Sequence, residues 1–273
     1  MSLFACMCNQ PQRLAEALGP VRASLVAPGP VARWGMGYVH GGEVLLSRTP
    51  RSMANEGEVP LDLSPAIEPV KSDCIIGHAA SGSGAELVAL PTEATQPFRF
   101  RRWMLAQDGG ATVEPAVWQQ LAERVPDFLR RNLRGRTSAE LTLHLLMAML
   151  HDQGMLDDPN LPSTVARRAI ADTLALFAST LTRAGGATAG RPGPGTLAAS
   201  NSRALWFARP EVGGAPSFIR RLHVLDDRGH RDDSFRGLLV TSGLPVGDGA
   251  EEVPAGSVLA VSRDLRVDIS PLA

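Results

Sequence analysis

Apolar residues follow two different periods along this chain, and the period changes twice. The first part holds short apolar runs of strand character, at residues 2–8, 32–39, 43–47, 74–79 and 98–106. From residue 114 to residue 183 apolar residues recur every three or four positions, which predicts helices. Strand-like runs then return at residues 204–208, 218–225, 237–241, 257–262 and 265–269. This order favours an α+β protein, with two sheets and helical layers packed on them, over alternating βαβ units.

Glycine and proline mark where these elements end. A His-Gly-Gly turn at residues 40–42 separates two strand-like runs, and glycines accept the positive φ angles of a tight turn, so we predict a β-hairpin. A short helix is predicted over residues 13–18. Prolines make residues 50–72 loop-rich, and residues 184–196 form a Gly/Pro-rich linker or mobile loop.

The helical part is predicted to contain three helices. The first follows Glu114 and is interrupted at Pro126, because proline removes a helix hydrogen bond. The second spans residues 138–150 and is apolar on most sides, which indicates burial. The third begins at Ser163. Together they are expected to form a layer.

The length allows one large domain or two small ones, and an apolar fraction of 44% is typical of a protein with a globular core. The net charge of −1 gives no general attraction to nucleic acid or to an anionic membrane. No apolar run reaches the length of a membrane span, and the opening residues do not resemble a signal peptide. Three cysteines make no disulfide framework in a chain of this size, so we expect a cytoplasmic protein. From the charge and the apolar runs we expect no nucleic-acid or membrane partner.

The first residues carry candidate chemistry. Removal of Met1 would leave Ser2 with both a hydroxyl and a free α-amine, and that amine titrates near neutrality and can act as the base for its own side chain. Ser2 is therefore a candidate N-terminal nucleophile. The alternative is that Met-Ser is an ordinary start and that Leu3 and Phe4 simply open the first core strand.

The cysteines allow other interpretations. Cys6 and Cys8 would face the same side of a strand, where a metal site with Cys74 or His78 is conceivable. The usual zinc spacing is absent, so we interpret them as small apolar core residues and expect no metal. A nucleophile at Cys8, released by cleavage after Met7, is a further alternative.

Two more groups of polar side chains stand out in the sequence. His144 and His151 lie seven residues apart on the predicted buried helix, and we interpret them as core or surface histidines. A basic run at residues 130–136 is the expected form of a solvated helix end, with docking of an acidic partner as the alternative.

Six short strings share their order and spacing with those of a known family. They are residues 1–5, 33–38, 75–78, 96–109, 239–244 and 253–257. They resemble strings of the class II, or N-terminal nucleophile, glutamine amidotransferases. In order, these are a Met-Cys opening, an Asp-Gly-Trp-Gly hairpin, a His-x-Arg strand, a His-Pro-Phe stretch running into His-Asn-Gly, a Ser-Glu-Pro-Leu strand and a Val-Pro-x-Gly strand. The most similar branch is the stand-alone bacterial type that includes ergothioneine-pathway amidohydrolases.

The resemblance implies a single domain over residues 1–273, folded as a four-layer αββα sandwich with two mostly antiparallel sheets between helical layers. In this family a terminal Cys attacks the side-chain amide of glutamine and ammonia leaves. That chemistry requires a nucleophile, oxyanion donors, and charged groups that hold the α-carboxylate and α-amine of the substrate. No cofactor is implied.

Four decisive positions differ from the family pattern. The nucleophilic Cys is replaced by Ser2, whose hydroxyl is a weaker nucleophile than a thiol. The Arg that binds the α-carboxylate falls on Ala80, and the acidic residue that binds the α-amine falls on Ser138. The oxyanion Asn falls on Asp108, and an ionised carboxylate cannot donate a hydrogen bond. These changes predict that glutamine hydrolysis is lost.

Some elements of the implied site survive. Gly109 can still offer a backbone N–H in the oxyanion region, and Ser83 offers a hydroxyl in a glycine-rich loop. His78 ends a strand, where it is expected to order the neighbouring loop beside the substrate-binding positions. We therefore expect a pocket that accepts a different ligand or none.

Two functions are compatible with these residues. The first is a binding or regulatory module with a degenerate glutaminase site, whose partner is a small-molecule amide or a protein. The alternative is an active serine-type N-terminal nucleophile amidohydrolase that acts on a non-glutamine amide. A chance likeness of an unrelated α+β domain is a third interpretation, and such a domain would lack two stacked sheets.

Overall fold

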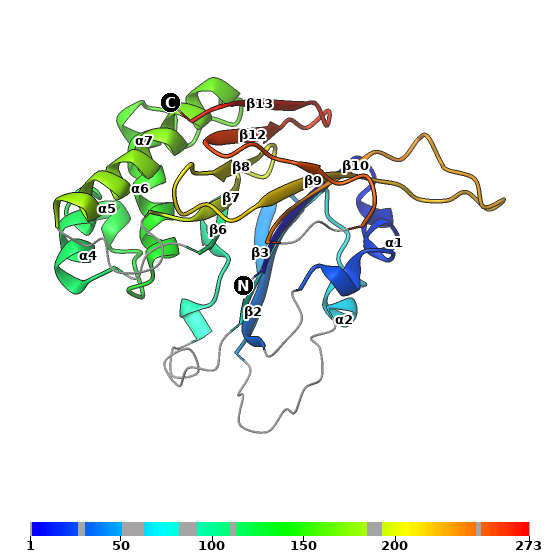
Figure 1. Cartoon of the computed structure of the whole chain (residues 1–273), viewed down its shortest axis with the longest axis horizontal. Coiled ribbons are helices and arrows are strands. Elements are labelled where there is room, and N and C mark those ends of the chain that lie inside the picture. The colour runs from blue at the N-terminus through cyan, green and yellow to red at the C-terminus, as the bar shows by residue number, and fades with distance from the viewer. Residues whose placement is uncertain are drawn as a thin grey trace.

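The structure is a computed structural model that describes residues 2–26, 31–50, 63–81, 92–109, 113–184, 193–243 and 247–272. Two antiparallel sheets lie face to face between two layers of helices (Figure 1). The predicted α+β class and the four-layer αββα sandwich are confirmed.

The first sheet has seven strands in the order β11-β9-β10-β1-β4-β2-β3. Their bounds are β1 Ser2–Cys8, β2 Val31–His40, β3 Glu43–Pro50, β4 Cys74–Ser81, β9 Ser217–Leu222, β10 Gly237–Ser242 and β11 Glu251–Glu252. β1 lies between β10 and β4, and its apolar residues are buried on both faces. The predicted hairpin is confirmed, because β2 pairs with β3 through a turn in which Gly41 and Gly42 have positive φ angles.

The second sheet has six strands in the order β13-β12-β8-β7-β6-β5. Their bounds are β5 Phe98–Phe100, β6 Trp103–Asp108, β7 Thr196–Ser200, β8 Leu205–Arg209, β12 Ser257–Val261 and β13 Val267–Pro271. The prediction of one strand over residues 98–106 is wrong. The chain reverses at Arg101 and Arg102 so that Phe98 pairs with Leu105. Arg101 adopts a φ of 52°, which a non-glycine residue rarely does, so the sequence carried no turn signal.

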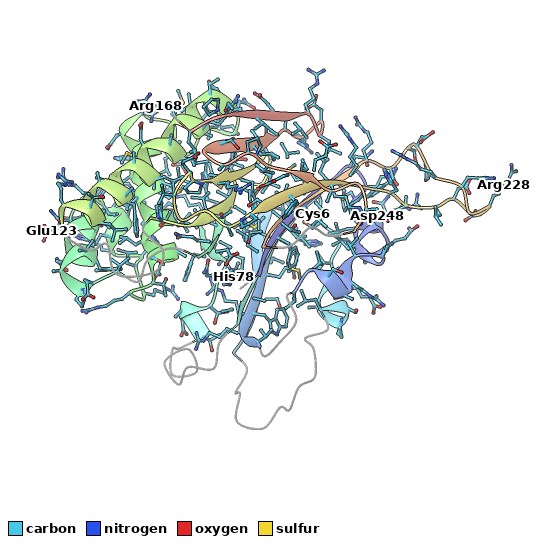
Figure 2. All side chains as sticks on the ribbon, viewed as in Figure 1. Cys6, His78, Glu123, Arg168, Arg228 and Asp248 are labelled. Atoms are coloured by element: carbon cyan, nitrogen blue, oxygen red, sulfur yellow. The ribbon has the colours of Figure 1, made fainter. Side chains whose placement is uncertain are left out.

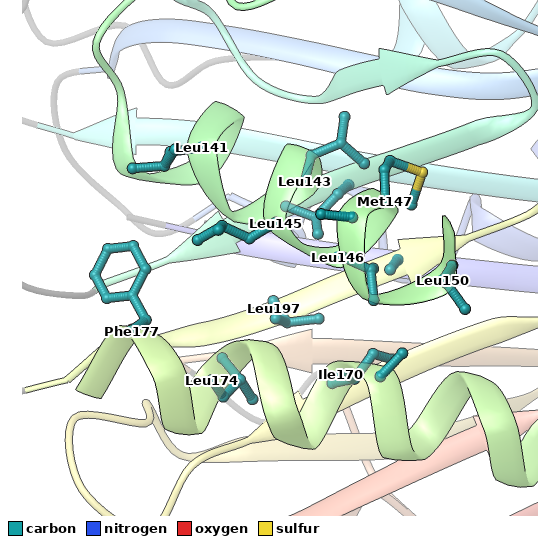
Figure 3. Packing of buried hydrophobic residues seen from close by; sticks show 14 of the residues in the cluster. Leu141, Leu143, Leu145, Leu146, Met147, Leu150, Ile170, Leu174, Phe177 and Leu197 are labelled. Carbon is teal, nitrogen blue, oxygen red and sulfur yellow. The ribbon is translucent and has the colours of Figure 1, made fainter. Parts of the chain in front are cut away.

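Two helical layers of unequal size cover the sheets. The six-stranded sheet is covered by α4 Pro115–Ala122, α5 Asp127–Arg130, α6 Ser138–Asp152 and α7 Ser163–Arg183. Figure 3 shows α6 and α7 packing on each other and on the sheet through Leu146, Leu174 and Leu197. This double contact explains why α6 is apolar on most sides. Among the described residues no helix has both the length and the apolar character that a membrane crossing requires.

The layer on the seven-stranded sheet is much thinner. It consists of α1 Leu14–Leu18 and α2 Ser64–Ile67, with the 3₁₀ turns η1 Pro11–Arg13 and η2 Arg22–Ser24 nearby; a third turn, η3 Thr92–Ala94, precedes β5. Leu14, Leu18 and Ile67 pack against Phe4 and Cys6 of β1. Burial of this apolar surface, rather than helix length, holds such short helices in place.

The alternation of side chains along β1 separates two parts of the core. Phe4 and Cys6 face the thin helical layer, whereas Leu3 and Ala5 face the second sheet and pack with residues such as Phe207. This alternation decides which residues of the neighbouring strands point between the sheets.

The hairpin between β9 and β10 extends beyond the sandwich. Figure 2 shows Arg228 at the tip of this arm, far from His78 in the interior. An isolated bridge between Leu225 and Arg231 continues the pairing along the arm.

Candidate functional site

A row of paired residues brings the candidate site together at one end of the sandwich. Leu3 of β1 pairs with His78 of β4 on one side and with Ser242 of β10 on the other. His78 and Ser242 follow the same alternation as Ile76 and Val240, which face the second sheet. The two polar side chains therefore point into the space between the sheets.

Asp108 meets this row from the opposite sheet. It is the last residue of β6 and is 3% exposed. Its Oδ2 accepts a hydrogen bond from the Ser242 hydroxyl. A buried carboxylate is thus held by a hydroxyl donor that is 134 residues away in the sequence and lies across the inter-sheet space.

His78 is 5% exposed, and burial lowers its pKa to about 4 even though the negative charge of Asp108 acts in the opposite direction. The imidazole is therefore neutral at pH 7. Its Nε2 lies 3.5 Å from Gln96 Nε2, which is an amide donor, so this ring nitrogen is the acceptor.

Gln96 connects His78 to the second sheet. Its amide donates to Gln107 O at 3.0 Å and accepts from Gln107 N at 2.6 Å, so the side chain extends the β5–β6 pairing by one step. The Gln96 backbone passes so close to the first sheet that position 35 requires glycine, because a Cβ there would lie 2.2 Å from Gln96 O. His78 lies within β4 and not at its end, and the loop that follows β4 lies outside the described residues, so the ordering of that loop stays a prediction.

Ser138 belongs to the helical side of β6. It opens α6 and is half-buried, and its carbonyl oxygen lies 2.9 Å from the Thr142 hydroxyl. The same hydroxyl lies 3.2 Å from Gln107 Oε1. Ser138 is therefore connected through Thr142 to Gln107, the residue before Asp108. Within the part of the chain that the structure describes, it forms no hydrogen bond with either polar residue of the inter-sheet row.

A buried arginine lies beside Ala80. Arg33 of β2 pairs with Ala80 of β4, is 3% exposed, and donates from Nη1 to Thr95 Oγ1 at 3.2 Å. Arg33 was not among the site residues predicted from the sequence. An arginine inside an apolar strand was the available signal, since arginine is seldom fully buried without a partner.

The remaining candidates lie at strand ends. The backbone of Ser2 pairs with Ala79, one residue before the Leu3–His78 pair. Gly109 follows Asp108 with a φ of 76° and is half-buried. Ser83 lies outside the described residues. The start of β1 and the end of β6 are thus at the same end of the sandwich.

The cysteines lie elsewhere. Cys8 is at the other end of β1, and burial raises its pKa to about 12. Cys6 and Cys8 face the thin helical layer, whereas Cys74 faces the second sheet. Among the described residues no group of His, Cys, Asp or Glu has the arrangement of a metal site.

Comparison of the sequence with protein-family models and with curated proteins found no match. Comparison with solved structures did. A glutamine aminotransferase class-II domain protein from Silicibacter pomeroyi superimposes with a TM-score of 0.64 and 16% identity over 100% of both chains. The chain has a class II glutamine amidotransferase-like fold.

Two further structures extend this finding. A predicted glutamine amidotransferase from Pseudomonas aeruginosa gives a TM-score of 0.57 at 15% identity, with 97% of this chain and 94% of that one covered. Glutamine phosphoribosylpyrophosphate amidotransferase from B. subtilis gives 0.56 at 14% identity, and this chain, covered completely, spans 49% of its length. At such identities the likeness concerns the fold.

Proposed function

We propose that this chain is a glutamine amidotransferase-like protein of the stand-alone bacterial type whose glutaminase centre has degenerated, and that it acts as a binding or regulatory module. The observation that carries the proposal is the hydrogen bond from Ser242 to Asp108. By the resemblance, this carboxylate takes the place of the family's oxyanion Asn, where it would repel the developing negative charge.

The other changed positions act in the same direction. Loss of one oxyanion donor costs about 10²- to 10³-fold in rate. Ala80 supplies no charge for an α-carboxylate, Ser138 supplies none for an α-amine, and a hydroxyl replaces the thiol at Ser2. A ligand of this site is then a small amide, bound with different polar contacts and not cleaved, or a segment of a partner protein.

Ammonia release from L-glutamine tests this proposal. Purified wild-type protein is expected to release no more ammonia than the Ser2→Ala variant, because Asp108 opposes the oxyanion in both. Release by the wild type that disappears in Ser2→Ala would contradict the proposal. Asp108→Asn in a Ser2→Cys background is the matched variant that restores two of the family residues.

The backbone position of Ser2 favours a second candidate function. Ser2 opens β1 beside Ala79, at the same end of the sandwich as Asp108 and Gly109. A free α-amine there would permit serine-type hydrolysis of an amide that lacks free α-groups. Mass spectrometry of the mature protein separates the two functions, since a retained Met1 blocks the amine and eliminates hydrolysis by this route.

A further inference from the structure

A second polar region lies beyond the Gln96–Pro97 segment. Gln96 contacts His78 on one side, and Pro97 O accepts a hydrogen bond from Arg48 of β3 on the other. Arg48 lines a cavity of about 800 Å³ between β3, β5 and α6. This volume is in the range of small-molecule sites. His78, Asp108 and Ser242 do not belong to its described lining.

A buried histidine lies in the wall of this cavity. His144 of α6 is 2% exposed, and its Nδ1 lies 2.8 Å from Glu140 O. A carbonyl oxygen only accepts, so Nδ1 carries the hydrogen and Nε2 presents a lone pair. Burial lowers the pKa of His144, which keeps the ring neutral. Within the described part of the chain, Nε2 has no hydrogen-bond partner.

Arginines provide the charge of the cavity. Arg48 and Arg99 donate to the backbone carbonyls of Pro97 and Val44, the latter at 2.6 Å, and a neutral acceptor does not cancel their charge. Arg48 Nε is buried and has no partner among the described residues. Arg134 is exposed, and no described residue accepts a hydrogen bond from its side chain. Arg101 also lines the cavity and pairs with Asp157.

The carboxylates in the lining compensate this charge only partly. The carboxylate oxygens of Glu140 accept from the backbone N–H groups of Arg134 at 2.9 Å and Gly135 at 2.8 Å, so Glu140 is held by the backbone. Glu43 and Glu93 also belong to the lining, and both are exposed to solvent. With Asp157, the described lining holds four carboxylates against five arginines, so a small excess of positive charge remains beside the buried acceptor of His144.

Aromatic rings hold these groups in place. The guanidinium of Arg48 lies over Phe98 with its carbon 5.4 Å from the ring centre, and that of Arg101 lies over Phe100 at 5.3 Å. Phe100 also meets the ring of His144 edge-on, with 6.0 Å between centres. A guanidinium fixed on an aromatic face loses less freedom when it binds an anion.

We propose that this cavity is a binding site for a small hydroxylated organic anion. Its phosphate or carboxylate groups would pair with Arg48, Arg99 and Arg134, and a hydroxyl or N–H of the ligand would donate to His144 Nε2. The proposal rests on the cavity alone and is independent of the fate of the glutaminase centre. A recessed lining with a buried acceptor fits a small molecule better than an acidic protein surface, which would contact the exposed arginines only.

Calorimetric titration of the full-length protein tests the proposal with four probes: ribose 5-phosphate, citrate, inorganic phosphate and glucose. Either hydroxylated anion is expected to bind, and glucose is not. Stronger binding of ribose 5-phosphate would identify phosphate as the recognised group, and stronger binding of citrate would identify carboxylate. Inorganic phosphate should bind about tenfold or more weakly, because it is too small to reach both the arginines and His144.

Three variants locate the bound anion. Arg134→Gln removes an exposed charge that folding does not need, and it should weaken binding about tenfold. His144→Phe should weaken binding of the hydroxylated anion but not that of inorganic phosphate. Arg228→Gln, at the tip of the β9–β10 arm, is the control and should change neither.

Long-range ¹H–¹⁵N NMR of the histidine rings gives a second readout. The Nε2 resonance of His144 should move on binding, as an acceptor that gains a donor does, while that of His78 stays in place. The proposal is wrong if neither hydroxylated anion binds at millimolar concentration, or if binding is the same in Arg134→Gln and Arg228→Gln. Binding without any change at His144 Nε2 would also contradict it.

Discussion

The polar groups on the two sides of the Gln96–Pro97 segment differ in how far the fold satisfies them. In the inter-sheet region Asp108 accepts from Ser242, and His78 faces the amide of Gln96. In the cavity, His144 Nε2 and Arg48 Nε have no partner among the described residues. Buried polar groups are almost always hydrogen-bonded, so the two unpartnered atoms support the ligand proposed for the cavity, whereas Asp108 and His78 already have partners in the fold.

The largest expected effect is in the inter-sheet region, where folding stability depends on pH because of His78. Its folded pKa of about 4 lies below the ordinary 6.5, so protonation favours the unfolded chain. The stability from the neutral ring is fully present above pH 6.5 and is lost as the pH falls towards 4. The full difference is on the order of 3 kcal/mol.

Denaturant unfolding of wild type and His78→Gln between pH 7.5 and 4 measures this difference. The variant should lose less stability over the window from 6.5 to 4 than the wild type does. His151→Gln, which replaces an exposed histidine, should follow the wild-type profile. Parallel profiles for wild type and His78→Gln would mean that His78 is not buried as a neutral ring.

Ser242→Ala should have the next largest effect. It removes the hydroxyl that donates to the buried carboxylate of Asp108, and hydrogen bonds to charged groups contribute about 2 kcal/mol. Chemical denaturation measures the loss. A double-mutant cycle with Asp108→Asn is the control, because Ser242→Ala should cost less when the charge is absent. Additive effects in the cycle would show that the two side chains do not interact.

The sequence was sufficient to predict most elements of the fold. The apolar periods predicted the two groups of strands and the helical layer, because burial on one face dictates those periods. The turn at Arg101 and the strand β7 were missed. The first lacks turn residues, and the second directly follows a Gly/Pro-rich segment that reads as a loop.

The site was predictable only in part, because strand pairing decides which side chains lie close together. The strings around His78 and Asp108 marked the positions that the first sheet and the second sheet bring together. The partners Ser242 and Arg33 are assigned by strand register, and register depends on which strands become neighbours in the sheet. No local pattern in one sequence carries that information.

A smaller effect is expected at the helix that joins the two regions. α6 carries Ser138 near Gln107 at its first turn and Glu140 and His144 on the cavity side. Thr137 caps it, with its hydroxyl accepting from Glu140 N at 3.3 Å. Thr137→Ala should cost about 1 kcal/mol in thermal or chemical unfolding, whereas Thr137→Ser should be nearly neutral. Equal losses in both variants would assign the effect to packing of the threonine methyl group instead.

The smallest effect separates the two buried histidines most directly. His144→Phe keeps the ring contact with Phe100 and removes Nε2, which has no bond within the described residues, together with the Nδ1–H bond to Glu140 O. Glu140 O still accepts a backbone hydrogen bond within the helix. The free energy of unfolding without ligand should therefore change by less than about 1 kcal/mol. A loss of several kcal/mol would mean that the fold itself satisfies Nε2. The polar groups of the cavity would then be hydrogen-bonded within the fold, as those of the inter-sheet row are, and the two regions would no longer differ.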